Sequence, residues 1–440
     1  MNNRSVKCKR FIWILSCVMA GALSGQESVH AEKLTLADGV RLVTVDSRAV
    51  KIAEQEESIS QADTLIARSL LLPRADGRYT QNYQELQPGM INPAGVVFTG
   101  ERSYYTYSLI MQQLLYDFGG TISYFQSNKR IYETKQLETK RIKNYLALQF
   151  ASTYYNLLES EKMVIVAERE KERLEGHLSN AQSLYKEGVI TKNDLLQAEV
   201  RLSDAKQKLI TSQNLRKIHH SELNNLLARP LTTTIETEEA NVVPATSVNL
   251  EEAQGSAEKD RYEMKIVDTT LEAAKLEESG KRAEYFPNFF LQGRYDYMKN
   301  KFALHEGMWA VLVGMNINFL SGGSTQAGLA KIASQKQRLI VERSKLIDDI
   351  RFEVERYYLE MVDAQEKMKV TKDATAQAEE NLRINKVKYT DGVGTATDVI
   401  DAITLLSVAE TNYYRSLYEF NRAYAGLMYS TGQDLVGIYR

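Results

Sequence analysis

The stretch YTDGVGTATDVIDA, residues 389–402, decides the fold because the chain carries nearly the same stretch earlier. YKEGVITKNDLLQA, residues 185–198, matches it at a constant offset of 204 residues (389 − 185), with Tyr, Gly, Val, Thr, Asp and Ala at the same places. In each copy a helical pattern runs up to a glycine and starts again after a threonine, as in two helices joined by a tight turn. The sequence therefore predicts two copies of one long helical hairpin.

The repeat extends over most of the chain. Arg68 and Pro73 recur as Arg282 and Pro287, Gly119-Gly120 recurs as Gly322-Gly323, and Tyr154-Tyr155 recurs as Tyr357-Tyr358. We therefore divide the chain into a leader (residues 1–31), a first repeat (32–240) and a second repeat (241–440), with the boundary in the segment Pro230–Pro244.

The leader has the composition of a secretory signal peptide. Arg4, Lys7, Lys9 and Arg10 precede the apolar run 11–23, and Val29-His30-Ala31 supplies small residues for cleavage. A lipoprotein signal ending at Cys17 is the alternative. Both cysteines, Cys8 and Cys17, lie in the leader, so the rest of the chain excludes disulfides, thiol catalysis and cysteine-bound metal.

Composition excludes some classes of protein. The chain is 43% apolar and 25% charged with a net charge of −2, so its charge does not favour nucleic-acid binding. After the leader no run approaches about 18 apolar residues, which excludes a transmembrane helix from the sequence. Any membrane-spanning segment would have to be made of strands.

Each repeat is predicted to contain the same elements in the same order. A helix ends before a proline, two strands with a loop between them follow, and a Gly-Gly turn then leads into a very long helix and a return helix. The helices cover residues 34–70, 121–185 and 191–228 in the first repeat and 250–285, 324–389 and 395–429 in the second. At a rise of about 1.5 Å per residue, about 65 residues extend roughly 100 Å, so each long helix needs partners along its length.

The return helices carry a seam that supplies such a partner. Residues recur at alternating steps of three and four, as Leu195, Ala198, Leu202, Ala205 and Leu209, and as Val399, Ala402, Leu406, Ala409 and Tyr413. This is heptad spacing with small residues between larger ones, which lets antiparallel helices approach closely. Each repeat should contain an antiparallel coiled coil whose tip is Gly188 or Gly392.

The strands alternate between apolar and polar residues, as transmembrane barrel strands do, with one face rich in aromatic residues. The residues predicted to face the membrane are Tyr79, Tyr105, Tyr107, Leu109, Phe289, Leu291, Tyr295, Tyr297, Trp309, Val311, Val313 and Ile317. A soluble antiparallel sheet would alternate in the same way. Four strands cannot enclose a lumen, since about eight are needed merely to enclose packed side chains, so a pore requires several copies of the chain.

Taken together, the repeat, the prolines Pro73 and Pro287 and the turn GVGTATDVIDA resemble the TolC family of outer-membrane efflux and secretion channels over essentially the whole chain after the leader. The resemblance implies a mostly α-helical homotrimer with a small β part, in which coiled-coil hairpins form a periplasmic α-barrel and four strands per chain enter a shared twelve-stranded β-barrel. Residues 230–244 and those after Thr431 would form a belt around the tunnel.

The resemblance also implies partners. These are a periplasmic adaptor protein, an inner-membrane transporter and the lipid of the outer membrane. The tip residues expected to face the adaptor are Lys186, Glu187, Gly188, Thr191, Lys192, Thr390, Asp391, Gly392, Thr395 and Thr397.

Asp398 and Asp401 of the opening stretch have two competing interpretations. Asp398 stands three residues after Thr395, the spacing of a capping box, and a carboxylate in the first turn is favoured by the helix dipole. Asp401 has Gln197 as its counterpart, and no cap requires it. In a trimer the two would give six carboxylates around one axis, a constriction at the periplasmic entrance that favours cations. Ala396 stands where the family can have a gating arginine, so a lock built on that arginine is not expected.

No enzyme is expected. The sequence contains no nucleophile elbow, phosphate loop or zinc-binding helix, and His219-His220 have no third ligand at useful spacing, so we expect no cofactor and no metal. The function predicted is an outer-membrane exit duct of an efflux or type I secretion system. The alternative is an exported coiled-coil scaffold or adhesin without a pore.

Overall fold

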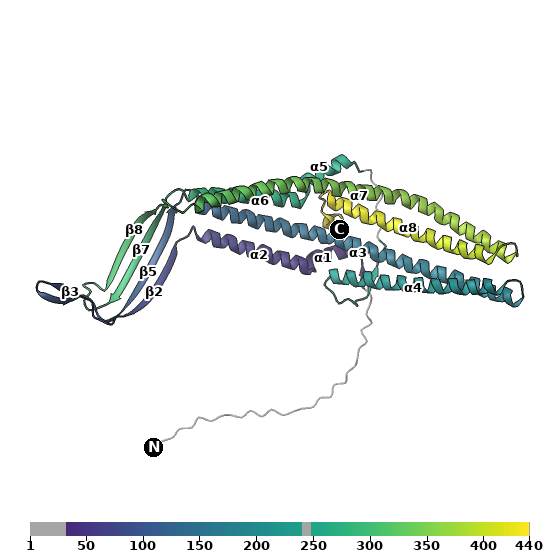
Figure 1. The fold of residues 1–440 in the computed structure, drawn as a ribbon, viewed down its shortest axis with the longest axis horizontal. Coiled ribbons are helices and arrows are strands. Elements are labelled where there is room, and N and C mark those ends of the chain that lie inside the picture. Colours follow the sequence, from purple (N-terminus) through teal and green to yellow (C-terminus); the bar gives the residue numbers. More distant parts are fainter. Residues whose placement is uncertain (1–31, 240–247, 440) are drawn as a thin grey trace, which may run out of the picture.

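The computed structural model describes residues 32–239 and 248–439. The predicted leader and the predicted repeat boundary at residue 240 lie outside these residues. The molecule is elongated, with a β-sheet at one end and two helical hairpins at the other (Figure 1).

The first part of the chain runs β1 (Glu32–Leu34), α1 (Leu36–Asp46), α2 (Arg48–Ser69), β2 (Arg74–Tyr83), β3 (Gly89–Asn92), β4 (Gly95–Phe98), β5 (Ser103–Tyr116), α3 (Gly120–Lys186), α4 (Lys192–Leu226) and β6 (Ile235–Thr237). The second part runs α5 (Leu250–Asp260), α6 (Tyr262–Ala283), β7 (Asn288–Lys299), β8 (Gly307–Asn316), α7 (Ser324–Thr390), α8 (Ala396–Ser430) and α9 (Leu435–Ile438). The predicted long helices and return helices are confirmed to within two residues, and the short pairs β1–β6 and β3–β4 were not predicted.

The prediction of one continuous helix before each proline was wrong. Ser47 has extended backbone (φ −57°, ψ 138°) and separates α1 from α2, and its hydroxyl caps α2 by accepting from the amide of Ala49 at 3.3 Å. Arg261 (φ −62°, ψ 136°) separates α5 from α6. Its buried guanidinium pairs with Glu263 and Glu353 and lies 5.3 Å from the ring of Tyr429. Glu353 and Tyr429 lie far from Arg261 in sequence, so helical periodicity alone does not reveal the break at Arg261.

The helices form one layer with α3 at its centre. Near the sheet the neighbours follow the order α2, α3, α6, α7, and toward the far end they follow the order α4, α3, α8, α7 (Figure 1). The main core lies halfway along, where the side chains of Phe150, Tyr154 and Leu157 are completely buried. The hydroxyl of Tyr154 donates to the carbonyl of Leu34 at 3.0 Å and accepts from the amide of Glu238 at 2.9 Å, which fastens β1 and the segment after β6 to α3.

The two tips share one turn geometry. Gly188 and Gly392 each have φ +75°, the left-handed region that glycine enters without strain. The amide of Val189 donates to the carbonyl of Leu184 at 2.9 Å, and that of Val393 donates to the carbonyl of Lys388 at 3.0 Å, the six-to-one bond of a Schellman motif. The predicted tips are therefore confirmed. The seam is confirmed at Ala198, Leu202 and Ala205 and at Val399, Ala402, Leu406 and Ala409, all of which are buried.

The sheet has the antiparallel order β2-β5-β7-β8. Its register sets Tyr79 opposite Tyr107, and Tyr107 opposite Tyr297. Leu109 and Trp309 both stand opposite Tyr295. Opposed residues share a face, so the alternation predicted from sequence does gather these side chains on one face of the sheet.

One predicted strand residue is wrong. Ile317 lies beyond β8, which ends at Asn316 opposite Asn288, the first residue of β7. Pro287, which precedes Asn288, has no amide hydrogen to continue the ladder, so the pairing of β7 with β8 stops at Asn288 and Asn316. Among the helices of the described residues, none is long and apolar enough to cross a membrane.

The close approach of α1 to α3 gives the first prediction. A Cβ on Gly39 would lie 1.9 Å from Cζ of Phe150, so Gly39→Ala should destabilise the fold by about 1–3 kcal/mol through overpacking. Phe150→Ala should cost about 3–5 kcal/mol by leaving a cavity. The double variant should cost less than the sum, because the cavity accepts the new methyl group. Urea unfolding of the three variants in detergent tests this, and strictly additive losses would contradict the proposed contact.

Candidate functional site at the hairpin tips

The carboxylate of Asp398 closes the N-terminus of α8. One of its oxygens accepts from the amide of Thr395 at 2.9 Å and from the hydroxyl of Thr395 at 2.7 Å, while the amide of Asp398 donates to that hydroxyl at 3.1 Å. The hydrogen bonds from the Thr395 side chain and backbone lower the pKa of Asp398, because they stabilise the charged carboxylate. The capping interpretation is confirmed, and a role of Asp398 in a constriction stays a prediction.

The first tip repeats this arrangement. The carboxylate of Asp194 accepts from the amide of Thr191 at 3.0 Å and from its hydroxyl at 2.7 Å. The amide of Asp194 in turn donates to that hydroxyl at 3.3 Å. Both return helices therefore begin with a capping box, which satisfies amides that a helix start leaves free. The repeated Thr and Asp of the two stretches are explained by this local chemistry.

Asp401 differs from Asp398. Its side chain is exposed and forms no hydrogen bond or ion pair with any residue in 32–239 or 248–439. One turn earlier on α8, the hydroxyl of Thr397 lies 3.4 Å from the side-chain oxygen of Gln197 on α4. The starts of α4 and α8 therefore lie side by side, and Asp401 lies near its own counterpart from the first hairpin.

The ten residues predicted to face an adaptor are all exposed at the end of the molecule farthest from the sheet (Figure 1). Sequence reasoning missed Val189 and Val393, which follow the tip glycines and are 62% and 78% exposed. The recurrence of Gly-Val in both copies is the signal that could have found them. Each tip thus presents an exposed apolar side chain surrounded by polar groups.

A half-buried ion pair joins the two hairpins between the tips and the main core. Arg173 of α3 makes two bonds to the carboxylate of Glu410 on α8, at 3.1 and 3.2 Å. Within the first hairpin, Lys208 of α4 pairs with the buried Glu170 of α3 at 2.8 Å. Because Arg173 and Glu410 lie far apart in sequence, their pairing could not be predicted from spacing.

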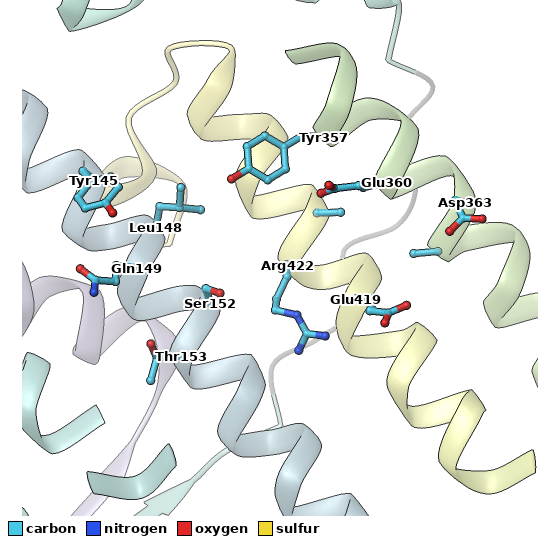
Figure 2. A pocket seen from close by; sticks show the side chains of 12 residues that line it. Tyr145, Leu148, Gln149, Ser152, Thr153, Tyr357, Glu360, Asp363, Glu419 and Arg422 are labelled. Carbon is cyan, nitrogen blue, oxygen red and sulfur yellow. The ribbon is translucent and has the colours of Figure 1, made fainter. Parts of the chain in front are cut away.

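A hollow of about 590 Å³ lies farther from the tips, between α3, α7 and α8 (Figure 2). Arg422 of α8 extends into it and donates to the side chains of Asn156 at 2.9 Å and Glu159 at 2.6 Å. The carboxylates of Glu360 and Glu419 line the same space. No histidine or cysteine stands beside its serine and threonine, so this lining does not form a nucleophilic catalytic site.

The two adjacent histidines have structural partners. His219 pairs with Glu222 at 2.9 Å, and His220 accepts from the amide of Ile235 at 3.1 Å, holding β6. Burial lowers the pKa of His220, consistent with a neutral ring that accepts this bond. Among the residues that the structure describes, no group of three or more His, Cys, Asp or Glu is placed to hold a metal ion.

Comparison with known proteins identifies the family. The model of the family described as outer membrane efflux protein matches residues 41–229 and 253–433. The chain belongs to this family. Its location is therefore the outer membrane, with the helices in the periplasm, and its general function is that of an outer-membrane efflux channel. The family consists of transport channels, and the predicted TolC-type relationship is confirmed.

Solved structures share the fold at low sequence identity. The CmeC outer membrane channel of Campylobacter jejuni superposes with a TM-score of 0.81 at 12% identity, covering 96% of this chain and 94% of that one. VceC of Vibrio cholerae gives 0.79 at 15% identity with 91% and 96% covered. The open state of the MtrE channel of Neisseria gonorrhoeae gives 0.73 at 18% identity with 91% and 89% covered. No curated protein sequence matches the chain closely enough to count as a relative.

The capping boxes give the second prediction. Thr395→Ala should destabilise the start of α8 by about 0.5–2 kcal/mol and speed amide exchange at residues 396–400, and Thr191→Ala should affect only the start of α4. Hydrogen exchange measures both, each variant serving as the control for the other. Faster exchange at both tips in either single variant would contradict independent caps.

The cap should also depend on pH. The pKa of Asp398 in the folded chain lies below the ordinary value of 3.8, so its stabilisation of α8 is complete above that value. It is lost as the pH falls through the lowered pKa, where the carboxylate becomes protonated. Protection of residues 396–400, corrected for the intrinsic exchange rate, should therefore be flat above pH 5 and fall at lower pH, and Asp398→Asn should remove this fall.

Proposed function

We propose that three copies of this chain assemble into a continuous exit duct that receives substrates from an inner-membrane transporter, through a periplasmic adaptor, in a tripartite efflux or type I secretion system. The observation that carries the proposal is the four-stranded sheet. In the described chain β2 pairs only with β5 and β8 only with β7, so both outer edges are free to pair. Unpaired backbone groups are costly in lipid, which favours closure with neighbouring copies.

The two faces of the sheet support an aqueous lumen. The apolar face presents Trp309, Val311 and Val313, which are 75%, 77% and 70% exposed, as expected for side chains that meet lipid. The opposite face carries charged side chains that form hydrogen bonds and ion pairs within it. Asp296 accepts from Ser108 at 2.6 Å, and Arg74 pairs with Asp76 at 2.9 Å.

The helical layer also has two free edges. On α7, at one edge, Val341, Phe352, Leu359 and Val370 are 58%, 68%, 55% and 67% exposed and share one side of the helix. On the other edge, α2 and α4 expose their own apolar residues, such as Ile59 at 56%. Packing α7 of one copy against α2 and α4 of the next would bury both edges. Three copies would bring twelve strands, whereas two would bring eight, which enclose little more than side chains.

The tips are the proposed docking and entrance region. Their exposed polar residues, with Val189 and Val393 at the turns, would meet the adaptor. Asp398 and Asp401 would ring the entrance, and Asp401, which has no partner among the described residues, would supply the charge that attracts cations. The rival function, a scaffold without a pore, leaves the free sheet edges unexplained.

Cross-linking between sheet edges tests the assembly. Tyr79→Cys on β2 should be combined in turn with Trp309→Cys, Val311→Cys or Val313→Cys on β8, so that three successive registers between copies are sampled. Neighbouring antiparallel strands bring Cα atoms to about 4.5–5.5 Å, within disulfide reach. At least one pair should give dimer and trimer bands after oxidation, while Tyr79→Cys alone should not. Absence of cross-links in every pair, or bands larger than a trimer, would contradict the assembly.

Single-channel recording tests the entrance. The wild-type channel should prefer cations and be blocked from the tip side by hexamminecobalt(III), and Asp401→Asn should weaken the block at least about tenfold because the ring loses three charges. Asp391→Asn is the matched control, since it removes the same charge from the exposed turn and should leave the block unchanged. An equal block in Asp401→Asn would refute this role for Asp401.

A further inference from the structure

The hairpin β3–β4 is an apolar element that the channel function leaves unexplained. It is a two-stranded antiparallel ribbon in which Met90 stands opposite Val97 and Ile91 opposite Val96. All four side chains are exposed, by 60%, 47%, 86% and 63%, as is Phe98 by 48%. An isolated two-stranded hairpin is at best marginally stable in water, so the exposure of its aliphatic residues requires a partner.

Both faces of this hairpin are apolar. Ile91, Val96 and Phe98 share one face, and Met90 and Val97 share the other, because opposed residues lie on the same side of a ribbon. A hairpin that packs on a protein surface needs only one apolar face and keeps a polar one toward water. Between Glu85 and Glu101 the chain contains no charged residue. This pattern indicates that the hairpin has an apolar environment on both of its faces.

The base of the hairpin is fixed to the rest of the sheet. The amide of Thr99 donates to the carbonyl of Pro88 at 2.8 Å, and that of Gln84 donates to the carbonyl of Arg102 at 2.8 Å. The amide of Lys301, in the loop between β7 and β8, donates to the carboxylate of Glu101 at 3.4 Å. The hairpin therefore extends in a defined direction. Figure 1 shows that it turns across the strands at the end of the sheet away from the helices, instead of continuing them.

We propose that this hairpin lies in the lipid at the outer surface of the membrane, with its two faces among acyl chains just beneath the head groups. The inference rests on the proposed function in one respect, namely that the sheet crosses the membrane. The helices lie in the periplasm, so the opposite end of the sheet emerges at the outer surface. An apolar hairpin that leaves the sheet there and runs across the strands enters the boundary between lipid and water.

The loop between β7 and β8 at the same end provides the contrast. Lys299 pairs with Glu306 at 2.8 Å across it, and Lys301 and His305 lie between them, so this loop suits water. Leu304 in this loop is 91% exposed, close to the value for Ile91. Exposure alone therefore does not decide whether a residue meets lipid, and the two positions form a matched pair.

Tryptophan fluorescence tests the inference in the intact channel. Trp309 is the only tryptophan outside residues 1–31, so Trp309→Phe gives a background into which Ile91→Trp, Val97→Trp or Leu304→Trp can be placed. Ile91 and Val97 lie on opposite faces. Each variant is reconstituted into phosphatidylcholine vesicles with or without bromine on the acyl chains, because bromine quenches tryptophan only on contact.

Lipid burial predicts that the tryptophans at 91 and 97 both emit at short wavelength and lose at least about half their intensity to brominated lipid, while the tryptophan at 304 does neither. Short-wavelength emission without quenching, at either position, would mean that another hairpin or protein covers it, and would overturn the inference. Long-wavelength emission would overturn it as well. Native Trp309 in the unsubstituted channel separates the hairpin inference from the proposal that the sheet crosses the membrane. If Trp309 is quenched while the tryptophans at 91 and 97 are not, the hairpin inference fails and the membrane-spanning sheet stands. If Trp309 is not quenched, both fail.

Discussion

Pairing of the 67-residue helices along their length is the constraint on which the rest of this structure depends. A single helix of that length would not be stable by itself in water, since most helical stability in proteins comes from tertiary packing. The chain supplies the partner from its own next segment by reversing at Gly188 and Gly392. The capping boxes at Thr191 and Thr395 then restart the helix at once, so the return helix begins directly at the tip and its small seam residues meet the long helix from there.

Because the capping boxes use a carboxylate at each tip, an acidic residue there is not by itself evidence of a role in transport. Asp398 is engaged in the cap by three hydrogen bonds to Thr395, so its occurrence in the repeat has a local cause whatever the channel transports. Asp401 has no such cause among the described residues and differs from its counterpart Gln197. A charge that the local fold does not require is the better candidate for a role in conduction.

The helical layer and the sheet are incomplete in the same sense. Each has two edges that expose groups normally buried or paired: apolar side chains on α7 and α2, and backbone groups on β2 and β8. In the proposed assembly the monomer is one segment of a closed wall, because repetition around an axis is the simplest way to satisfy all four edges at once. The β3–β4 hairpin is a separate case, because its apolar residues cover both faces and no single neighbouring edge could cover them.

The sequence by itself determined the long helices, the tips, the seams and the apolar face of the sheet, because each depends on spacing within a few residues: heptads, a glycine followed by a cap, and alternation. It also revealed the repeat, which needs only comparison of the chain with itself. The tertiary structure alone decided the breaks at Ser47 and Arg261, the end of β8 before Ile317, and the pairing of Arg173 with Glu410. Apart from the break at Ser47, whose capping bond to Ala49 is local, each of these depends on contacts with distant parts of the chain, which local spacing does not reveal.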